Sequence, residues 1–528
     1  MFEAGGFGVA VTVAPVQPFD AAEWGPLPEG VLRRPSRLTD LLDPGGFDDA
    51  GFVRELSAVS VAAAKLAAYQ AALVAKMAAR RPAQWDRTQD QPGHGVEGWL
   101  PDRPPAGVSE FFADELAMVK NTSVAAAVSL LNRSMALVHQ LPGTWEALAD
   151  GLIDESRANA IVRSLAGQSA AAGGQVDPAV VAEVEAQALG WAIAGETPVR
   201  LRERTAAALV AVDAAAADRR RRRAERHVDV TVRSVGDGMS ELVAGMPTPV
   251  AAACRETVDS YARMAKADGD ERPVGQLRAQ VLADLILRPW DTSREPVTAH
   301  LTVLAPLPAL TRCPAAGPAA IDDTDTASVG GAPITAGQLR EVLAQLDAVC
   351  PGGLQAPTGG SLGIDPVDHD TGALRATVTR PELERLVRRG CRDHPQADCG
   401  CVVLDRPPSV DRYEPTPAQH RFIKARDRTC RHPGCRRPAA WTDTDHVQPH
   451  ADGGVTDCAN LCCLCRRHHR LKTHAPHWQY RMTPDGILLV TTPSGVTRAT
   501  RPPGTRLPAY LPLAGIGGRP DPDDPPPF

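Results

Sequence analysis

Aromatic residues are scarce in this chain, where they make up 4% of 528 residues. Its core must therefore be built mainly from alanine, valine and leucine, and a core of this composition favours closely packed helices. A chain of this length also exceeds what one hydrophobic core supports, so two or three domains are expected.

The chain lacks the sequence marks of export and of membrane insertion. Residues 1–15 have no basic segment followed by an apolar stretch, as a secretion signal requires. The best apolar run, residues 206–217, is shorter than a membrane span and is interrupted by Asp213. These absences predict a cytoplasmic protein with no membrane partner.

An overall positive charge is missing as well, because 57 Lys and Arg stand against 63 Asp and Glu, for a net charge of −6. Any surface that binds nucleic acid must therefore be local. Residues 412–474 hold twelve basic and six acidic residues, so their net charge is twelve minus six, or +6. This reversal is typical of a phosphate-binding surface. A solvated helix face is the alternative.

The pattern of apolar residues predicts a mainly helical domain over residues 30–390 with a small β element. Helices are expected at residues 48–81, 109–141, 145–166, 178–194, 198–217 and 249–265. Short strand-like runs are expected at residues 227–235, 297–305 and 373–378. A linker over 391–412 and a smaller α+β domain over 413–500 follow, and composition predicts disorder at residues 1–30 and 501–528.

Nine of the twelve cysteines fall between Cys391 and Cys465, and such clustering in a cytoplasmic chain indicates metal binding rather than disulfides. Cys430 and Cys435 flank a Pro-Gly turn, which makes half of a tetrahedral zinc site. Cys465 and His468 supply the other half. The sequence therefore predicts a closed structural zinc site that stabilises a small domain. Free thiols are the alternative.

Other cysteines and histidines in this region have less regular spacing. A second zinc site could be formed by Cys391, His394, Cys399 and Cys401, although free thiols in a loop are the alternative. Cys458, Cys462 and Cys463 are predicted to be buried small apolar residues. Surface or packing roles are expected for His432, His450, His474 and His477, with direct contact to metal or phosphate as the alternative.

Between the two zinc half-sites lies a strand-like stretch that ends in Asp445 and His446, followed by a Gly-Gly turn and then Asn460. Neighbouring strand residues point to opposite faces, so these two side chains must have different tasks. A carboxylate can hold a divalent cation, and an imidazole can accept a proton from water. Asn460 could order the loop or ligate the metal. Phosphodiester hydrolysis needs such a set.

At this point the sequence resembles the HNH endonucleases, whose fold is the ββα-metal finger. The match covers Asp445-His446-Val447-x-Pro449, Gly453-Gly454-x-Thr456, Asn460-Leu461 and the run from Leu464 to Lys472. The resemblance implies His446 as the general base, and Asp445 and His469 as ligands of a catalytic Mg²⁺ or Mn²⁺. With Asn460, these form the expected site, and DNA is the implied substrate.

The same resemblance concerns the short helix around the second half-site. In a nuclease of this class that element lies against DNA, so we expect nucleic-acid contacts from Arg466, Arg467, Arg470 and Lys472. His468 takes a slot where many relatives have cysteine, so the zinc site would be Cys3His.

More diffusely, the rest of the chain is similar to a bacterial subgroup in which a long helical domain precedes the nuclease. The shared features are Asp114-Glu-Leu-Ala117, Leu141-Pro-Gly-Thr144 and Tyr413-Glu-Pro-Thr-Pro-Ala418. Two rivals to the nuclease stay open. One is a non-catalytic zinc-finger protein that binds DNA, and the other is an interaction or mobile-element protein led by the helical domain.

Overall fold

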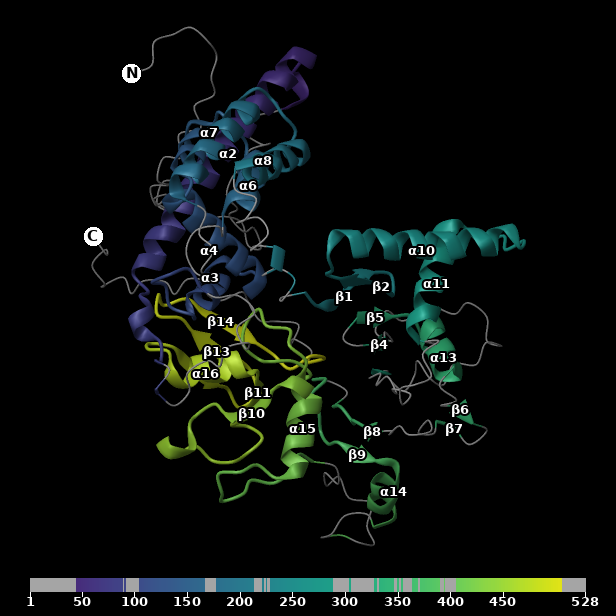
Figure 1. Cartoon of the computed structure of the whole chain (residues 1–528). Helices are drawn as coiled ribbons and strands as arrows, with labels where there is room; N and C mark the ends of the chain where they lie inside the picture. Colours follow the sequence, from purple (N-terminus) through teal and green to yellow (C-terminus); the bar gives the residue numbers. More distant parts are fainter. Residues whose placement is uncertain are drawn as a thin grey trace. The chain divides into compact units, whose positions relative to one another are not determined.

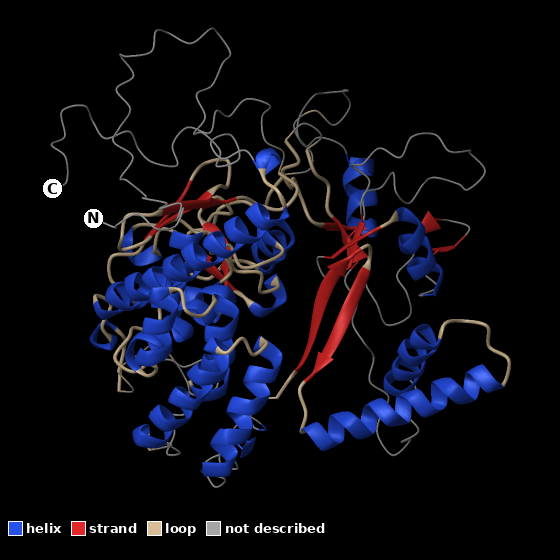
Figure 2. Cartoon of the chain, turned by 90° about the horizontal axis from the view of Figure 1, so that it is seen from above, coloured by secondary structure: helices blue, strands red, loops and turns tan. Residues whose placement is uncertain are grey.

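A computed structural model describes residues 44–88, 90–91, 104–166, 177–212, 221–222, 225, 228–287, 303–304, 327–329, 332–345, 349–350, 353–354, 363–368, 371–389, 394 and 405–505. Over these residues the chain is mainly helical with small antiparallel sheets (Figures 1 and 2). This confirms the predicted fold class at the level of a helical N-terminal part and an α+β C-terminal part. Of the segments 1–30 and 501–528, predicted to be disordered, residues 1–30 and 506–528 lie outside the described residues.

The chain divides into two compact units, one of residues 1–217 with 364–528 and the other of residues 218–363. This differs from the expectation of one helical domain over residues 30–390. The reason lies in burial, because Glu110 and Asp114, in the helical N-terminal part, share buried contacts with α16 (Arg466–His474) that a local helical pattern does not reveal.

The longest helix, α2 (Asp49–Ala79), lies where the sequence predicts it. Asp48 caps its first turn by accepting a hydrogen bond from the amide of Gly51 at 2.7 Å. Alanines line its buried face, and their small side chains let α4 and α5 approach closely. This helix is also the one described segment that is long and apolar enough to span a membrane, and part of its surface packs inside the protein.

Helices α3 to α8 complete the N-terminal part. Their bounds are α3 Phe112–Lys120, α4 Val124–His139, α5 Pro142–Asp150, α6 Glu155–Leu165, α7 Pro178–Ile193 and α8 Pro198–Val212. The continuous helix predicted over 109–141 is wrong, because Asn121 adopts a left-handed conformation that ends α3. Ser123 then caps α4 by accepting from the amide of Ala126.

Among its described residues, the unit of residues 218–363 holds one well-formed hairpin, two longer helices and several short elements. Its elements are β1 Val230–Gly236, β2 Met239–Ala244, α10 Thr248–Ala267, α11 Val274–Leu287, β3 Val303–Leu304, β4 Ala327–Val329, β5 Ala332–Ile334, α13 Ala336–Gln345, β6 Val349–Cys350 and β7 Gly353–Leu354. The strands β1 and β2 pair antiparallel. The predicted strand at 227–235 is confirmed, and the one at 297–305 lies mostly outside the described residues.

The C-terminal part carries the residues of the predicted site. Its elements are β8 Gly363–Ile364, β9 Val378–Thr379, α14 Arg380–Arg389, α15 Pro417–Asp427, β10 Asp443–His446, β11 Leu461–Leu464, α16 Arg466–His474, β12 Gln479–Met482, β13 Leu488–Thr491 and β14 Thr497–Thr500. The strands β10 and β11 pair antiparallel and lead into α16, while β12, β13 and β14 form an antiparallel meander.

A buried ion cluster ties these C-terminal elements together. Asp427, at the end of α15, is fully buried and pairs with Arg426 and Arg431. The same carboxylate accepts from the amide of Cys463 in β11, and Arg431 donates to the carbonyl oxygens of Gly486 and Thr500. Every charge in the cluster therefore has partners, as burial requires.

Candidate functional site

The structure brings together the four residues predicted to bind zinc. One ligand atom each from Cys430, Cys435, Cys465 and His468 lies within 4.8 Å of the others. The Nδ1 atom of His468 lies 3.3 Å from Sγ of Cys430 and 3.2 Å from Sγ of Cys465. This set, called the Cys3His cluster below, could hold a metal ion.

Local backbone geometry explains how the cluster forms. Residues 430–435, called the knuckle, turn at Gly434, whose φ is +78°. The amide of Cys435 donates to the carbonyl oxygen of His432 and closes this turn. Cys465 is the N-cap residue of α16, which places His468 one turn later on the same side.

The thiols in this region differ in their ionisation. Hydrogen bonds from Cys430 and Cys435 hold the pKa of Cys465 well below its usual range, whereas burial raises the pKa of Cys430. Outside the cluster, burial raises the pKa of Cys458 to about 11 and that of Cys463 to about 12. The prediction that Cys458, Cys462 and Cys463 are buried is confirmed.

A second group of metal-binding side chains, formed by Asp114, His432 and His468, lies beside the cluster. The two imidazole rings are stacked, with centroids 3.9 Å apart and an interplanar angle of 10°. Lone pairs in stacked, parallel rings run parallel, so they cannot converge on one ion. This group is therefore not a second metal site.

Asp445 and His446 face opposite sides of β10, as predicted. Asp445 pairs with Cys462 and His446 with Leu461 in the antiparallel register. On the side that faces α16, Oδ1 of Asp445 lies 3.5 Å from Nε2 of His469. The predicted cation ligands Asp445 and His469 therefore lie close together.

Asp443 and Lys472 also contact this pair, and the sequence analysis did not predict either contact. Asp443 lies on the same face of β10, two residues before Asp445, and its Oδ2 lies 3.0 Å from Nδ1 of His469. The alternation Asp-x-Asp along a strand was the signal for it. Lys472 places Nζ 2.8 Å from Oδ2 of Asp445, and its side chain is only 8% exposed.

His446 is buried on the other face of β10. Its Nε2 lies 2.8 Å from Oγ1 of Thr456, and that hydroxyl donates to the carbonyl oxygen of Arg412 at 2.5 Å. The ring of Tyr413 stacks on the imidazole at 5.4 Å, and the ring of His450 meets it edge-on. Burial lowers the pKa of His446, which favours a neutral imidazole.

The side chain of Asn460 forms hydrogen bonds with the loop between β10 and β11. Its Oδ1 accepts from the amide of Gln448 at 2.9 Å, and its Nδ2 donates to the carbonyl oxygens of Gln448 and Val455. Of the two roles left open by the sequence, these bonds correspond to ordering the loop.

The four cations predicted to contact nucleic acid have different surroundings. Arg466 is 62% exposed and pairs with Asp443. Arg467 pairs with Asp114 of α3, and buried Arg470 forms two bonds with Glu110. Arg467, Arg470 and Lys472 are each paired with a carboxylate, so Arg466 is the most exposed of the four. This pairing results from tertiary packing, because Asp114 of α3 and Glu110, just before α3, contact the side of α16 that carries both arginines.

Asp114 is another residue that the sequence analysis did not identify as functional. Its carboxylate accepts from Arg467 and lies 2.9 Å from Nε2 of His468. Burial alone would raise the pKa of Asp114, but Arg467 and His468 hold it below its usual value. Sequence spacing could not reveal these contacts, because Asp114 lies 353 positions from Arg467 and 354 positions from His468.

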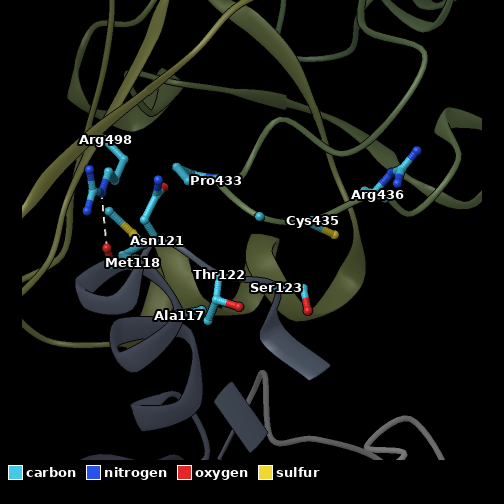
Figure 3. A pocket seen from close by; sticks show the side chains of 10 residues that line it. Ala117, Met118, Asn121, Thr122, Ser123, Pro433, Cys435, Arg436 and Arg498 are labelled. Carbon is cyan, nitrogen blue, oxygen red and sulfur yellow. Dashed lines mark hydrogen bonds between the residues drawn. The ribbon is translucent and has the colours of Figure 1, made fainter. Parts of the chain in front are cut away.

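A cavity lies between the end of α3 and the knuckle (Figure 3). Arg498 donates from Nε to the carbonyl oxygen of Met118 at its edge. A Cβ atom on Gly434 would lie 2.9 Å from the carbonyl oxygen of Thr122, so glycine permits the close approach. Cys435 lines the cavity and is the least buried member of the Cys3His cluster. The cluster is therefore nearest to solvent here.

The second zinc site that the sequence left open cannot be compared with the structure, because Cys391, Cys399 and Cys401 lie outside the described residues. Among the other histidines, His432 places Nδ1 2.8 Å from the hydroxyl of Tyr480, which agrees with a packing role.

Comparison with known proteins finds similarity over part of the chain. It is 43% identical over 125 residues to the uncharacterized protein Rv3776 of Mycobacterium tuberculosis, which covers 24% of this chain and 23% of that protein. It is 36% identical over 146 residues to the uncharacterized protein Rv2100 of the same organism, which covers 27% and 25%. The chain thus spans about a quarter of the length of the curated relatives it matches. No protein-family model matches the chain, and no solved structure matches it significantly.

Proposed function

We propose that the chain is a metal-dependent endonuclease of the HNH type that hydrolyses phosphodiester bonds in DNA. The observation that carries this proposal is the arrangement on β10, where Asp445 faces His469 and His446 faces Thr456. One strand thus presents a cation-binding group on one side and a proton acceptor on the other.

The hydrogen bonds of His446 support its role as the general base. A hydroxyl has one proton, and Thr456 gives its proton to the carbonyl oxygen of Arg412. Nε2 of His446 must then be the protonated nitrogen that donates to Thr456. This leaves a lone pair on Nδ1, which has no hydrogen-bond partner among the described residues. Nδ1 is therefore the atom that would accept a proton from the attacking water.

Asp445 and His469 would hold the divalent cation, for which Mg²⁺ and Mn²⁺ are the proposed identities. Two ligands bound at about 2.0–2.1 Å to one ion lie roughly 3 Å apart, and the Asp445–His469 distance of 3.5 Å is close to that value. Asp443 fixes the ring by binding Nδ1, so Nε2 offers its lone pair to the ion. When bound, such an ion neutralises the charge that develops on the phosphate.

Zinc is the proposed metal of the Cys3His cluster. Three thiolates and one imidazole are the ligands that zinc prefers, and four ligands close its tetrahedral shell. A closed shell leaves no position for water, so this metal would stabilise the fold and take no part in the reaction.

DNA is the proposed partner, although fewer cations remain for it than expected. The basic residues from 412 to 474 that are exposed to solvent are Arg412, Arg421, Lys424, Arg428, Arg436, Arg437 and Arg466. Phosphate contacts by these side chains would supply affinity that falls as salt rises. A cytoplasmic location is part of the same proposal.

One observation favours a second candidate, a non-catalytic zinc-stabilised module that binds DNA. Lys472 neutralises Asp445 from 2.8 Å, on the carboxylate that would hold the cation. A lysine that stays there would weaken cation binding by charge repulsion. If the chain is a nuclease, Lys472 must either move away from Asp445 when the cation binds or remain next to the bound cation.

Plasmid cleavage tests the proposal directly. We expect the purified full chain to nick or linearise supercoiled plasmid with Mg²⁺ or Mn²⁺, and to leave it intact with excess chelator. If no divalent cation produces cleavage, the endonuclease proposal fails. Salt-sensitive binding to the same plasmid without cleavage would then identify the second candidate, whereas the absence of both would favour an interaction role for the helical part.

Asn460→Ala should separate loop ordering from metal binding. The substitution removes three hydrogen bonds to the loop, so we expect a loss of about 1–3 kcal/mol in stability and slower cleavage. The Mn²⁺ concentration for half-maximal activity should not change. Gln448→Ala is the matched control, because it removes one side-chain bond in the same loop and keeps those of Asn460. A selective weakening of Mn²⁺ dependence in Asn460→Ala would instead make Asn460 a ligand.

A further inference from the structure

The seam between α3 and the C-terminal part is polar, buried and fully paired. Asp114 is 0% exposed and binds both Arg467 and His468, while Glu110 binds Arg470. All three partners lie on α16, more than 350 positions away in the sequence. The N-terminal helical part of the chain therefore contacts α16, the helix that supplies His468 to the Cys3His cluster.

The apolar contacts of this seam reach the Cys3His cluster too. Met118, near the end of α3, is buried in one group with Cys430, Cys465 and residues of β11 and β13. The amide of Ser494, in the β13–β14 turn, donates to Glu115 of α3 at 3.1 Å. The helix α3 is thus part of the hydrophobic core that surrounds the cluster.

His468 lies between Asp114 and the sulfur atoms. Its Nδ1 faces Cys430 and Cys465, and its Nε2 faces Oδ1 of Asp114 at 2.9 Å. A carboxylate that binds the far nitrogen of a metal-ligating histidine fixes the orientation of the ring and makes it a better ligand. Asp114 occupies that position, and it comes from outside the zinc-binding segment.

We propose that Asp114 of α3 is the outer carboxylate of the metal centre, so that the helical part of the chain completes the zinc site. This inference rests on the zinc site proposed above. It makes Asp114 a positioning residue, which acts on the metal through His468. It also implies that metal binding and the docking of α3 are coupled, since each orients His468 or its neighbours.

Zinc affinity of the full chain, measured by competition with a chromogenic chelator, tests the proposal. Asp114→Asn keeps the shape of the side chain but removes its charge, and we expect affinity to fall about 10- to 100-fold. Glu115→Gln is the matched control. Glu115 is a buried carboxylate on the same helix that pairs with Arg81 and does not touch the cluster. It should keep the affinity of the wild type.

The outcomes separate this inference from the proposed function. Absence of zinc in the wild type would remove the zinc site itself. A wild type that binds zinc and an Asp114→Asn variant of equal affinity would overturn only the role of Asp114. Equal losses in Asp114→Asn and Glu115→Gln would also overturn it, because the effect would then be general destabilisation. If Arg467→Gln lost as much zinc affinity as Asp114→Asn, the effect would belong to the Asp114–Arg467 ion pair and not to the contact of Asp114 with His468.

If Asp114→Asn does not fold, the wild type alone decides the question. Removal of zinc by a chelator should increase hydrogen exchange in α3 together with α16, while α7 keeps its protection. The helix α7 is a suitable reference because its buried residues belong to a separate core group with α6 and α8. Unchanged protection of α3 after zinc loss would overturn the proposal.

Discussion

His446→Ala should lower the rate of plasmid cleavage by about 10²- to 10⁴-fold, the usual contribution of a general base. The reason is that Nδ1 of this ring is the proposed proton acceptor, with Nε2 fixed by Thr456. The variant should keep its zinc and its affinity for DNA, since His446 belongs neither to the Cys3His cluster nor to the exposed cations. Cleavage rates at saturating Mn²⁺ provide the measurement.

Two comparisons make the assignment specific. His450→Ala removes an exposed imidazole that meets the same ring edge-on, and it should change the rate only a few-fold. Added imidazole should restore part of the activity of His446→Ala, because a free base can take the vacated place, and it should not restore Asp445→Ala. Equal cleavage by wild type and His446→Ala would refute the role given to this residue.

The Cys3His cluster was predictable because its information is local. Each half-site is a pair of ligands within six residues, and a turn or a helix start sets the distance between them. The meander β12–β14 was predictable for the same reason, since its turns lie at Pro-Asp-Gly and Pro-Ser-Gly. Local chemistry specifies these elements without help from the rest of the fold.

The environment of the α16 cations was not predictable from the sequence. Counting charge treats every arginine as a surface group, yet Arg467 binds Asp114 of α3 and Arg470 binds Glu110, just before that helix. Nothing in the local pattern of α16 says that one of its faces is covered by a distant helix. The positive charge of this region therefore overstated the surface available to DNA, and the same contact concealed Asp114.

The sequence contains a signal for the break between α3 and α4, but the continuous apolar spacing outweighs it in the prediction. Apolar spacing continues across Asn121 and Ser123, and it predicts one long helix. Asn tolerates the left-handed conformation that ends a helix, and Ser is a favoured N-cap residue. The break matters for the site, because it directs the end of α3 toward the knuckle, where Thr122 meets Gly434.

Cys430→Ala should remove about one equivalent of zinc per chain and unfold the C-terminal part. Structural zinc contributes about 10–16 kcal/mol of apparent binding free energy in small zinc modules, which is comparable to the roughly 5–15 kcal/mol stability of a whole domain. Three ligands cannot close a tetrahedral shell, and Cys430 also accepts from the amide of Cys465. Metal analysis and thermal unfolding would measure both effects.

Cys462→Ala is the matched control for this substitution. Cys462 is fully buried in the same core group as Cys430, but it is outside the Cys3His cluster. It should keep its zinc and lose only packing energy, so the difference between the two variants isolates the metal. Full zinc content in Cys430→Ala, or equal zinc loss in both variants, would contradict the ligand set. Because α2 and α4–α8 bury a core of their own, their helical signal should survive when the C-terminal part unfolds.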